Sequence, residues 1–286
     1  MKYAVIDVGS NSVRLMFHDG TKTLEKRVKT TRLAESMGEE RRLRVDAIDR
    51  TISAISVFLE QAKEENVDSV YVFATAAVRN AVNQSQFLEE YNKRCDAPIE
   101  VVSGEMEARL GCLGALNGRD GGIIDVGGAS TEINVVKDGN CVYLKSINLG
   151  AVSLKDACGQ DENKVFAFVK DKIKEYGNVP KTKYYSIGGT ATTVASMLME
   201  MEVYDPNRVD GFAVNKSDIE KLKDKLFSMS VEERKLLKGL QPERAEIIAG
   251  GVAILCLIMD MIGINEFTVS EKDNLEGYLM QKRGIK

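Results

Sequence analysis

The sequence predicts an α/β protein with two domains of similar construction. A strand-like apolar run at residues 3–6 ends in Asp7 and a turn rich in Gly and Ser, and the same pattern returns at residues 122–124, which end in Asp125. The two copies lie farther apart than the repeats of solenoid proteins, whose periods reach about 50 residues. Because strands and helices alternate after each copy, we expect two mixed sheets flanked by helices.

The first domain is predicted to begin with three strands within residues 2–31, which turn at Gly9 and at Asp19-Gly20. Apolar residues at helical spacing indicate a helix over residues 45–62. Short apolar runs and a second helical pattern complete the domain. They predict a strand at 69–74, a strand at 99–102 and a helix at 105–116.

The second domain is predicted to repeat this order. Its expected strands are three within 122–147, one at 184–187 that runs into a third Gly-rich turn, and one at 267–270. Its expected helices are 161–176, 216–227, 231–237, the apolar 244–261 and the closing 275–283. A turn-rich stretch near residues 117–122 sets the predicted domains at 1–118 and 119–286. The last helix, at about 275–286, is a candidate for packing back on the first domain.

Composition narrows the classes of partner. The chain of 286 residues is 44% hydrophobic and carries a formal charge of −4, so no global basic field would attract nucleic acid. The N-terminus reads directly into a strand and lacks the pattern of a signal peptide. The apolar stretch 247–264 contains Gly250, Gly251 and Asp260, so we interpret it as a buried helix and expect no membrane partner. Five scattered cysteines without a C-x-x-C pair favour the reducing cytoplasm.

The two Gly- and Ser-rich turns predict phosphate binding. Such turns present backbone N–H groups with little side-chain bulk, so they can surround a phosphate. Asp7 and Asp125 each add a carboxylate at a strand end, where a magnesium ion could bind. Two such turns that face one another would form a clamp for a phosphate.

Six stretches of the chain, in order, resemble the exopolyphosphatase / guanosine pentaphosphate phosphatase (Ppx/GppA) family. They are Ala4-Val-Ile-Asp-Val-Gly-Ser-Asn-Ser-Val-Arg-Leu, Ala74-Thr-Ala-Ala-Val-Arg-Asn-Ala-Val-Asn, Ser103-Gly-Glu-Met-Glu-Ala-Arg-Leu, Ile124-Asp-Val-Gly-Gly-Ala-Ser-Thr-Glu, Ile187-Gly-Gly-Thr-Ala-Thr-Thr and Pro242-Glu-Arg-Ala-Glu-Ile-Ile-Ala-Gly-Gly. The resemblance implies two ribonuclease H-like domains, the superfold of actin, sugar kinases and Hsp70 ATPase domains, with an interdomain cleft. The length resembles the short, two-domain members of the family.

The resemblance also implies an activity. The family releases the terminal phosphate of inorganic polyphosphate or the 5′ γ-phosphate of pppGpp, so a polyanionic phosphate substrate is expected. Magnesium is the usual metal, with manganese as an alternative. The sequence does not rank polyphosphate against pppGpp, because both present the same terminal group.

Site residues follow from the matched motifs. Glu107 matches the glutamate that activates the attacking water, as a general base would, and Glu132 matches a second acidic position. Asp7 and Asp125 are the expected metal ligands. The expected phosphate-binding residues come from three turns and three basic positions: Gly9, Ser10, Asn11, Ser12, Gly127, Gly128, Ser130, Thr131, Gly188, Gly189, Thr190, Arg14, Arg79 and Arg244.

Three departures from the family pattern keep alternatives open. Met106, Ala129 and Leu275 stand where the family usually has a glutamate, a glycine and an arginine, and they bear on substrate choice and turnover. One alternative is a sensor that binds an alarmone or nucleotide in the same cleft with little hydrolysis. An ATP-dependent kinase of the same superfold ranks last, because a base at Glu107 favours water as the acceptor. A homodimer is also expected, with Phe166 and Phe168 as candidate surface residues.

Overall fold

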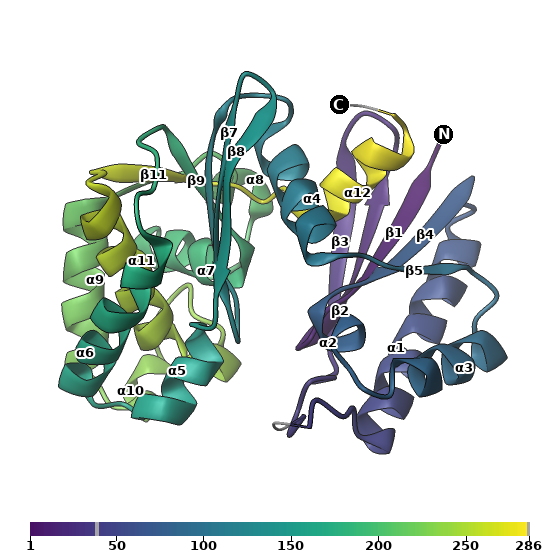
Figure 1. Ribbon diagram of the computed structural model, residues 1–286, viewed down its shortest axis with the longest axis horizontal. Coiled ribbons are helices and arrows are strands. Elements are labelled where there is room, and N and C mark those ends of the chain that lie inside the picture. Colours follow the sequence, from purple (N-terminus) through teal and green to yellow (C-terminus); the bar gives the residue numbers. More distant parts are fainter. Residues whose placement is uncertain (38–39, 285–286) are drawn as a thin grey trace. The chain divides into compact units, whose positions relative to one another are not determined.

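A computed structural model of the chain describes residues 1–37 and 40–284. The chain divides into two compact units, Met1–Leu110 with Asn274–Lys286, and Gly111–Asp273. The sequence placed the division at 118/119, whereas the contacts place it inside one helix. The last helix groups with the first unit. Figure 1 shows both units.

The first unit contains a five-stranded sheet in the order β3-β2-β1-β4-β5. The strands β1, β2 and β3 pair antiparallel, and β4 and β5 add in parallel to β1. Its elements are β1 (Tyr3–Val8), β2 (Ser12–His18), β3 (Thr23–Thr30), α1 (Val45–Glu64), β4 (Ser69–Ala74), α2 (Ala76–Arg79), α3 (Gln84–Arg94), β5 (Ile99–Val101), α4 (Gly104–Leu116) and α12 (Asn274–Lys282). The helix α4 extends into the second unit after Leu110.

The central strand β1 is buried on both faces, and its alternation separates two cores. Ala4, Ile6 and Val8 pack into the cluster that holds α1 and α3, while Tyr3 and Val5 pack into the cluster that holds Leu110 and α12. Figure 1 shows α1 and α3 together on one face of this sheet. Since side chains alternate along a strand, Asp7 is on the same face as Tyr3 and Val5, the face that α4 and α12 cover.

The second unit contains a six-stranded sheet in the order β10-β11-β9-β6-β7-β8. Its elements are β6 (Gly121–Val126), β7 (Thr131–Lys137), β8 (Asn140–Ile147), α5 (Ala151–Cys158), α6 (Glu162–Lys172), η1 (Ile173–Tyr176), β9 (Tyr184–Ile187), α7 (Gly188–Leu198), α8 (Pro206–Val209), β10 (Ala213–Asn215), α9 (Lys216–Ser228), α10 (Val231–Arg234), η2 (Pro242–Arg244), α11 (Ile248–Ile262) and β11 (Glu266–Val269).

The two sheets share one topology. In both, three antiparallel strands come first and the third is at the edge, and two later strands extend the other side in parallel. The second sheet adds β10, which pairs antiparallel with β11. This arrangement confirms the predicted pair of similar α/β domains.

The apolar stretch of the sequence forms α11, and nearly all of its side chains are buried in the core of the second unit. This confirms the interpretation of the stretch as a buried helix. Among the residues that the structure describes, we find no helix with both the length and the apolar character that a membrane crossing requires.

Several elements differ from the prediction. The third Gly-rich turn is the first turn of an unpredicted helix, α7, and α3 and β10 were also missed. The expected helix 161–176 ends in a 3-10 turn, η1, and the expected helix 231–237 keeps helical geometry only over α10. Phe166 packs edge-on against Phe227 and, with Phe168, lies against the core of the second unit. These two phenylalanines therefore do not form a free apolar patch, and the homodimer stays a prediction.

Candidate functional site

In the first unit, Asp7 is the penultimate residue of β1 and lies opposite Arg14 of β2. The Asp7 side chain is almost fully buried, and its Oδ2 accepts hydrogen bonds from Nε of Arg14, at 3.1 Å, and from NH2 of the same guanidinium. A buried carboxylate needs such a partner, because its burial is costly when it is unpaired. Arg14, a predicted phosphate ligand, is thus held directly beside the predicted metal ligand.

The loop 9–12 directs two of its N–H groups away from the segment 31–34, which supports its carbonyls. The N–H of Gly9 donates to the carbonyl of Ser12, at 3.0 Å. The carbonyls of Ser10 and Asn11 accept from backbone N–H groups of residues 31–34, at 2.8–3.0 Å. In a trans peptide, the carbonyl and the following N–H point in opposite directions. The N–H groups of Asn11 and Ser12 therefore point away from that segment, in the manner of an anion-binding nest.

The second unit repeats this loop with a different support. The N–H of Gly127 donates to the carbonyl of Ser130, again at 3.0 Å. The carbonyls of Gly127 and Gly128 accept from the first N–H groups of α5, residues 151–153, at 2.9–3.0 Å. By the same argument, the N–H groups of Gly128 and Ala129 point away from α5. The methyl of Ala129 leaves this backbone geometry intact.

Asp125 is the penultimate residue of β6 and lies opposite Glu132 of β7, in the same register as Asp7 and Arg14 in the first unit. Glu132 is half-buried, and its Oε1 accepts a hydrogen bond of 2.5 Å from the hydroxyl of Ser146 on β8. The sequence did not single out Ser146. The sequence gives little indication of this contact, because Ser146 becomes the cross-strand neighbour of Glu132 only once β7 and β8 are paired.

Two predicted threonine ligands serve the backbone in this structure. The hydroxyl of Thr131 donates to the carbonyl of Leu149, and the hydroxyl of Thr190 donates to the carbonyl of Val126 at 2.8 Å. Both side chains are buried. These hydroxyls therefore fix the ends of the strands that carry the loop 127–130, and neither is presented as a ligand.

The start of α7 lies against Asp125. Gly188 has a φ of +79°, and a Cβ built on it would come 2.5 Å from Oδ1 of Asp125. A glycine is therefore required both by the backbone conformation and by the close carboxylate. The first N–H groups of a helix have no partner within it and favour anions. The turn predicted at 188–190 is the start of such a helix, and its role as a phosphate donor stays a prediction.

Arg244 supports this helix start from η2. Its NH1 donates to the carbonyl of Gly189 and, at 2.8 Å, to the hydroxyl of Thr193. Burial lowers the pKa of the Arg244 guanidinium from its usual value, although an arginine remains protonated at neutral pH. Neither Glu243 nor Glu246 forms a salt bridge with Arg244, while Glu246 pairs with Lys155 at 3.1 Å.

Glu107 is on the first turn of α4 and is paired with Arg79, the last residue of α2. NH1 of Arg79 donates to Oε2 of Glu107 at 2.7 Å and to the carbonyl of Val102 at 3.0 Å. The two side chains are 28% and 25% exposed, so water can reach the carboxylate. A predicted phosphate ligand thus holds the predicted base in place.

The carboxylates suit a magnesium ion. Mg²⁺ prefers oxygen ligands and usually keeps several waters, with one or two carboxylates and substrate phosphates as the other ligands. Asp7 and Asp125 each offer a carboxylate beside a loop of outward N–H groups, and Gly188 leaves the space next to Asp125 open. Within residues 1–37 and 40–284, no group of three or more His, Cys, Asp or Glu could form an all-protein cage. The carboxylates of Asp7 and of Asp125 are oxygen donors of the kind that magnesium prefers.

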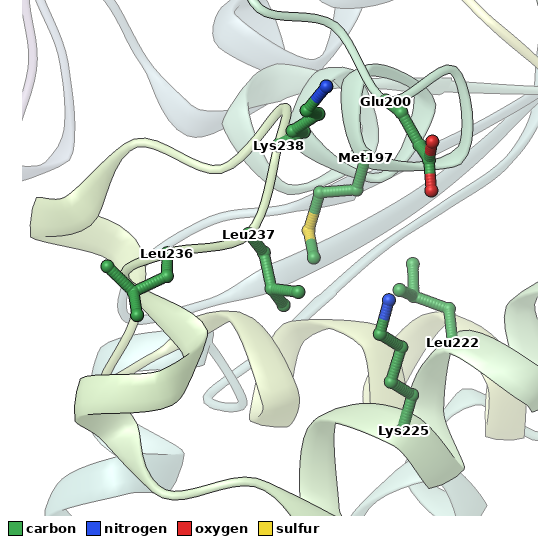
Figure 2. A pocket seen from close by; sticks show the side chains of 7 residues that line it. All are labelled: Met197, Glu200, Leu222, Lys225, Leu236, Leu237 and Lys238. Atoms are coloured by element: carbon green, nitrogen blue, oxygen red, sulfur yellow. The ribbon is translucent and has the colours of Figure 1, made fainter.

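One cavity of the second unit lies away from Asp125. It has a volume of about 200 Å³ and is lined by residues from the end of α7 and just after it, from α9 and from the segment after α10, which Figure 2 shows: Met197, Glu200, Leu222, Lys225, Leu236, Leu237 and Lys238. It adjoins the C-terminal end of α7, whereas Asp125 adjoins the N-terminal end. At about 1.5 Å per residue, the eleven residues of this helix separate the two by roughly 15 Å.

A model of the Ppx/GppA phosphatase family matches residues 13–284. The chain belongs to the Ppx/GppA phosphatase family. Exopolyphosphatase 2 of Mycobacterium tuberculosis is 27% identical over 99% of this chain and 99% of its own length. The guanosine-5'-triphosphate,3'-diphosphate pyrophosphatase of Vibrio parahaemolyticus is 27% identical over 98% of this chain and 59% of its own length.

Relatives of other lengths and a solved structure complete the comparison. The bifunctional 3-dehydroquinate synthase/phosphatase of Fusobacterium nucleatum is 28% identical over 97% of this chain, which spans 46% of that protein. The crystal structure of the Aquifex aeolicus Ppx/GppA family member is 27% identical, covers 99% of this chain and 97% of its own, and has a TM-score of 0.85. Family and fold class are thereby confirmed.

Proposed function

We propose that this Ppx/GppA protein is a magnesium-dependent phosphohydrolase that releases the terminal phosphate of inorganic polyphosphate or the 5′ γ-phosphate of pppGpp. The observation that carries the proposal is the repeated loop: in each unit, supported carbonyls leave two successive N–H groups pointing outward beside a strand-end aspartate. Relatives over the length of this chain bear the names of both activities.

The chain supplies a base for water. Phosphoryl transfer needs positioned oxygens, charge neutralisation and an oriented nucleophile, with little covalent chemistry from the protein. We propose that Glu107 accepts a proton from the attacking water, and that Arg79 keeps its carboxylate in the required orientation through the bond to Oε2. The N–H groups of the loops 9–12 and 127–130 would bind the phosphate oxygens and stabilise their negative charge.

The carboxylate of Asp7 in the first unit and that of Asp125 in the second would each serve as a magnesium ligand, with Glu132 as a further acidic group opposite Asp125. Magnesium supplies charge neutralisation at the phosphate oxygens. Arg14 contributes a guanidinium next to Asp7, and its planar fork suits two phosphate oxygens. Arg244 binds the carbonyl of Gly189 and so supports the first N–H groups of α7.

The test is the substitution Glu107→Gln. Because a general base contributes about 10²- to 10⁴-fold, phosphate release from long-chain polyphosphate or pppGpp with magnesium should fall by about that factor, while substrate binding persists. The matched control is Glu105→Gln, an exposed glutamate on the same first turn of α4, which should retain full turnover.

Two outcomes would contradict the proposal. Binding of pppGpp by the unaltered protein without phosphate release above background would favour the sensor. Product formation that requires a sugar or another acceptor would favour the kinase. A panel of polyphosphates of several lengths, tripolyphosphate, ATP and pppGpp, each with magnesium or manganese, separates these cases.

A further inference from the structure

The C-terminal helix α12 makes an unusually close backbone contact with the helix that carries Glu107. A Cβ built on Gly277 of α12 would come 1.9 Å from the carbonyl oxygen of Leu110 on α4. Real Cβ contacts are essentially never shorter than 3.0 Å, so any side chain at this position would force the two helices apart by about 1 Å. Leu110 follows Glu107 by one helical turn, about 4.5 Å along the axis.

The helix α12 is also held firmly by strands of the first sheet. The ring of Tyr278 stacks on Phe73 of β4 with centroids 4.4 Å apart, and its hydroxyl donates to Glu100 of β5 at 2.6 Å. The buried carboxylate of Glu276 accepts from the hydroxyl of Thr23 at 2.8 Å and from Nζ of Lys26 at 3.0 Å, both on β3. These contacts attach α12 to three strands of the first sheet, so it forms a fixed support.

We propose that Gly277 is a positioning residue for Glu107: it lets α4 lie against the fixed α12, and this contact sets the place of the carboxylate. The inference rests on the proposed function, since it assigns Glu107 the role of base. Packed helices shift as rigid bodies because interiors are dense, so a displacement at Leu110 is transmitted to Glu107. A misplacement of about 1 Å in a catalytic group can cost about 10²-fold in rate.

The experiment combines Gly277→Ala with a second substitution. Gly277→Ala should lower kcat for long-chain polyphosphate with magnesium by about 10- to 100-fold, with KM within about twofold. If the effect runs through Glu107, then Gly277→Ala should cause no further loss in a Glu107→Gln background, because residues that act as a unit are not additive. An equal loss in both backgrounds would overturn the inference.

A control variant distinguishes a displacement of Glu107 from a general loss of protein stability. Ile52→Ala removes a fully buried side chain of α1 from the core that packs Ala4, Ile6 and Val8, whereas Leu110 and α12 belong to the other core of this unit. It therefore destabilises the first unit away from the contact between α4 and α12, and it should lower the Tm but leave kcat unchanged. A fall in kcat for Ile52→Ala as large as that for Gly277→Ala would contradict a role specific to α4.

A measurement without substrate distinguishes this inference from the proposed function. Amide hydrogen exchange over residues 104–110 should rise more in Gly277→Ala than in Ile52→Ala. An equal or smaller rise in Gly277→Ala would overturn the inference whatever the activity. Full turnover in Glu107→Gln would instead overturn the proposed function. If Gly277→Ala does not fold, Tyr278→Phe replaces it, because this change removes only the hydrogen bond to Glu100. Tyr278→Phe should change kcat and the amide exchange of residues 104–110 in the same direction but by less. No change in either quantity would count against the inference.

Discussion

The pair of Arg79 and Glu107 yields the sharpest prediction. From the sequence, Arg79 was predicted to bind phosphate. In the structure, its NH1 donates hydrogen bonds to Glu107 at 2.7 Å and to the carbonyl of Val102 at 3.0 Å. Arg79→Ala removes both bonds. A hydrogen bond to a charged group contributes about 1.5–3 kcal/mol, and exposed ion pairs contribute only about 0.2–1 kcal/mol. Because the pair is about one-quarter exposed, we expect a loss of about 1–2 kcal/mol in the free energy of unfolding.

The effect on turnover separates the two roles of Arg79. If it orients the base, Arg79→Ala should lower kcat by about 10- to 100-fold, which corresponds to about 1.4–2.7 kcal/mol in the activation barrier, and leave KM nearly unchanged. The assay is phosphate release from long-chain polyphosphate with magnesium, alongside urea unfolding. Arg94→Ala is the control, since Arg94 donates to Asp49 at 2.6 Å and to Ser53 at 2.7 Å in the same unit but away from Glu107. A raised KM with unchanged kcat would refute the positioning role.

Two further predictions concern Gly188 and Glu100. Gly188→Ala forces an L-residue to a φ of +79°, which costs about 1–2 kcal/mol, and its Cβ displaces the carboxylate of Asp125. The magnesium concentration for half-maximal activity should therefore rise several-fold. Gly211→Ala, at a φ of +84° in open space, is the control, because it should have the same strain and keep the magnesium dependence. Bonds from Lys282 and Tyr278 lower the pKa of Glu100 below its usual 4.5, so its stabilising contribution is present above that pH and is lost as the pH falls through the lowered pKa. Glu100→Gln should therefore lower the Tm at pH 6 and converge with the unaltered protein toward pH 3, and a constant difference in Tm would contradict this assignment.

Strong periodic signals allowed much of the fold to be predicted. The strands β4 and β9 have the predicted bounds, because each is a short apolar run with a clear break on both sides. The helix α7 was missed because it opens with two glycines and contains β-branched threonines, which have low helix propensity. Its buried positions at Ala191, Val194 and Ala195 were the available signal. The helix α3 buries only Phe87 and Tyr91, too few residues to define a period.

The parts of the candidate site that are determined by neighbouring residues in the sequence could be predicted. The aspartates and the loops follow directly from strand ends and turn composition, so their places were visible in the sequence. The partners of these residues were not. The bond from Arg79 to Glu107 depends on how α2 approaches α4, and the engagement of Thr131 and Thr190 depends on carbonyls of Leu149 and Val126. Such long-range pairings depend on tertiary packing, which local propensity does not determine.

The grouping of α12 with the first unit affects the order in which the protein can mature during synthesis. Translation proceeds from the N-terminus, and domains generally fold as they emerge. A nascent chain that reaches only Asp273 already has every strand of both sheets, yet it has no Gly277 against Leu110 and no Tyr278 on Phe73. The first unit, although its strands are made first, is therefore completed only after the whole second unit has been synthesised, when α12 is added to it.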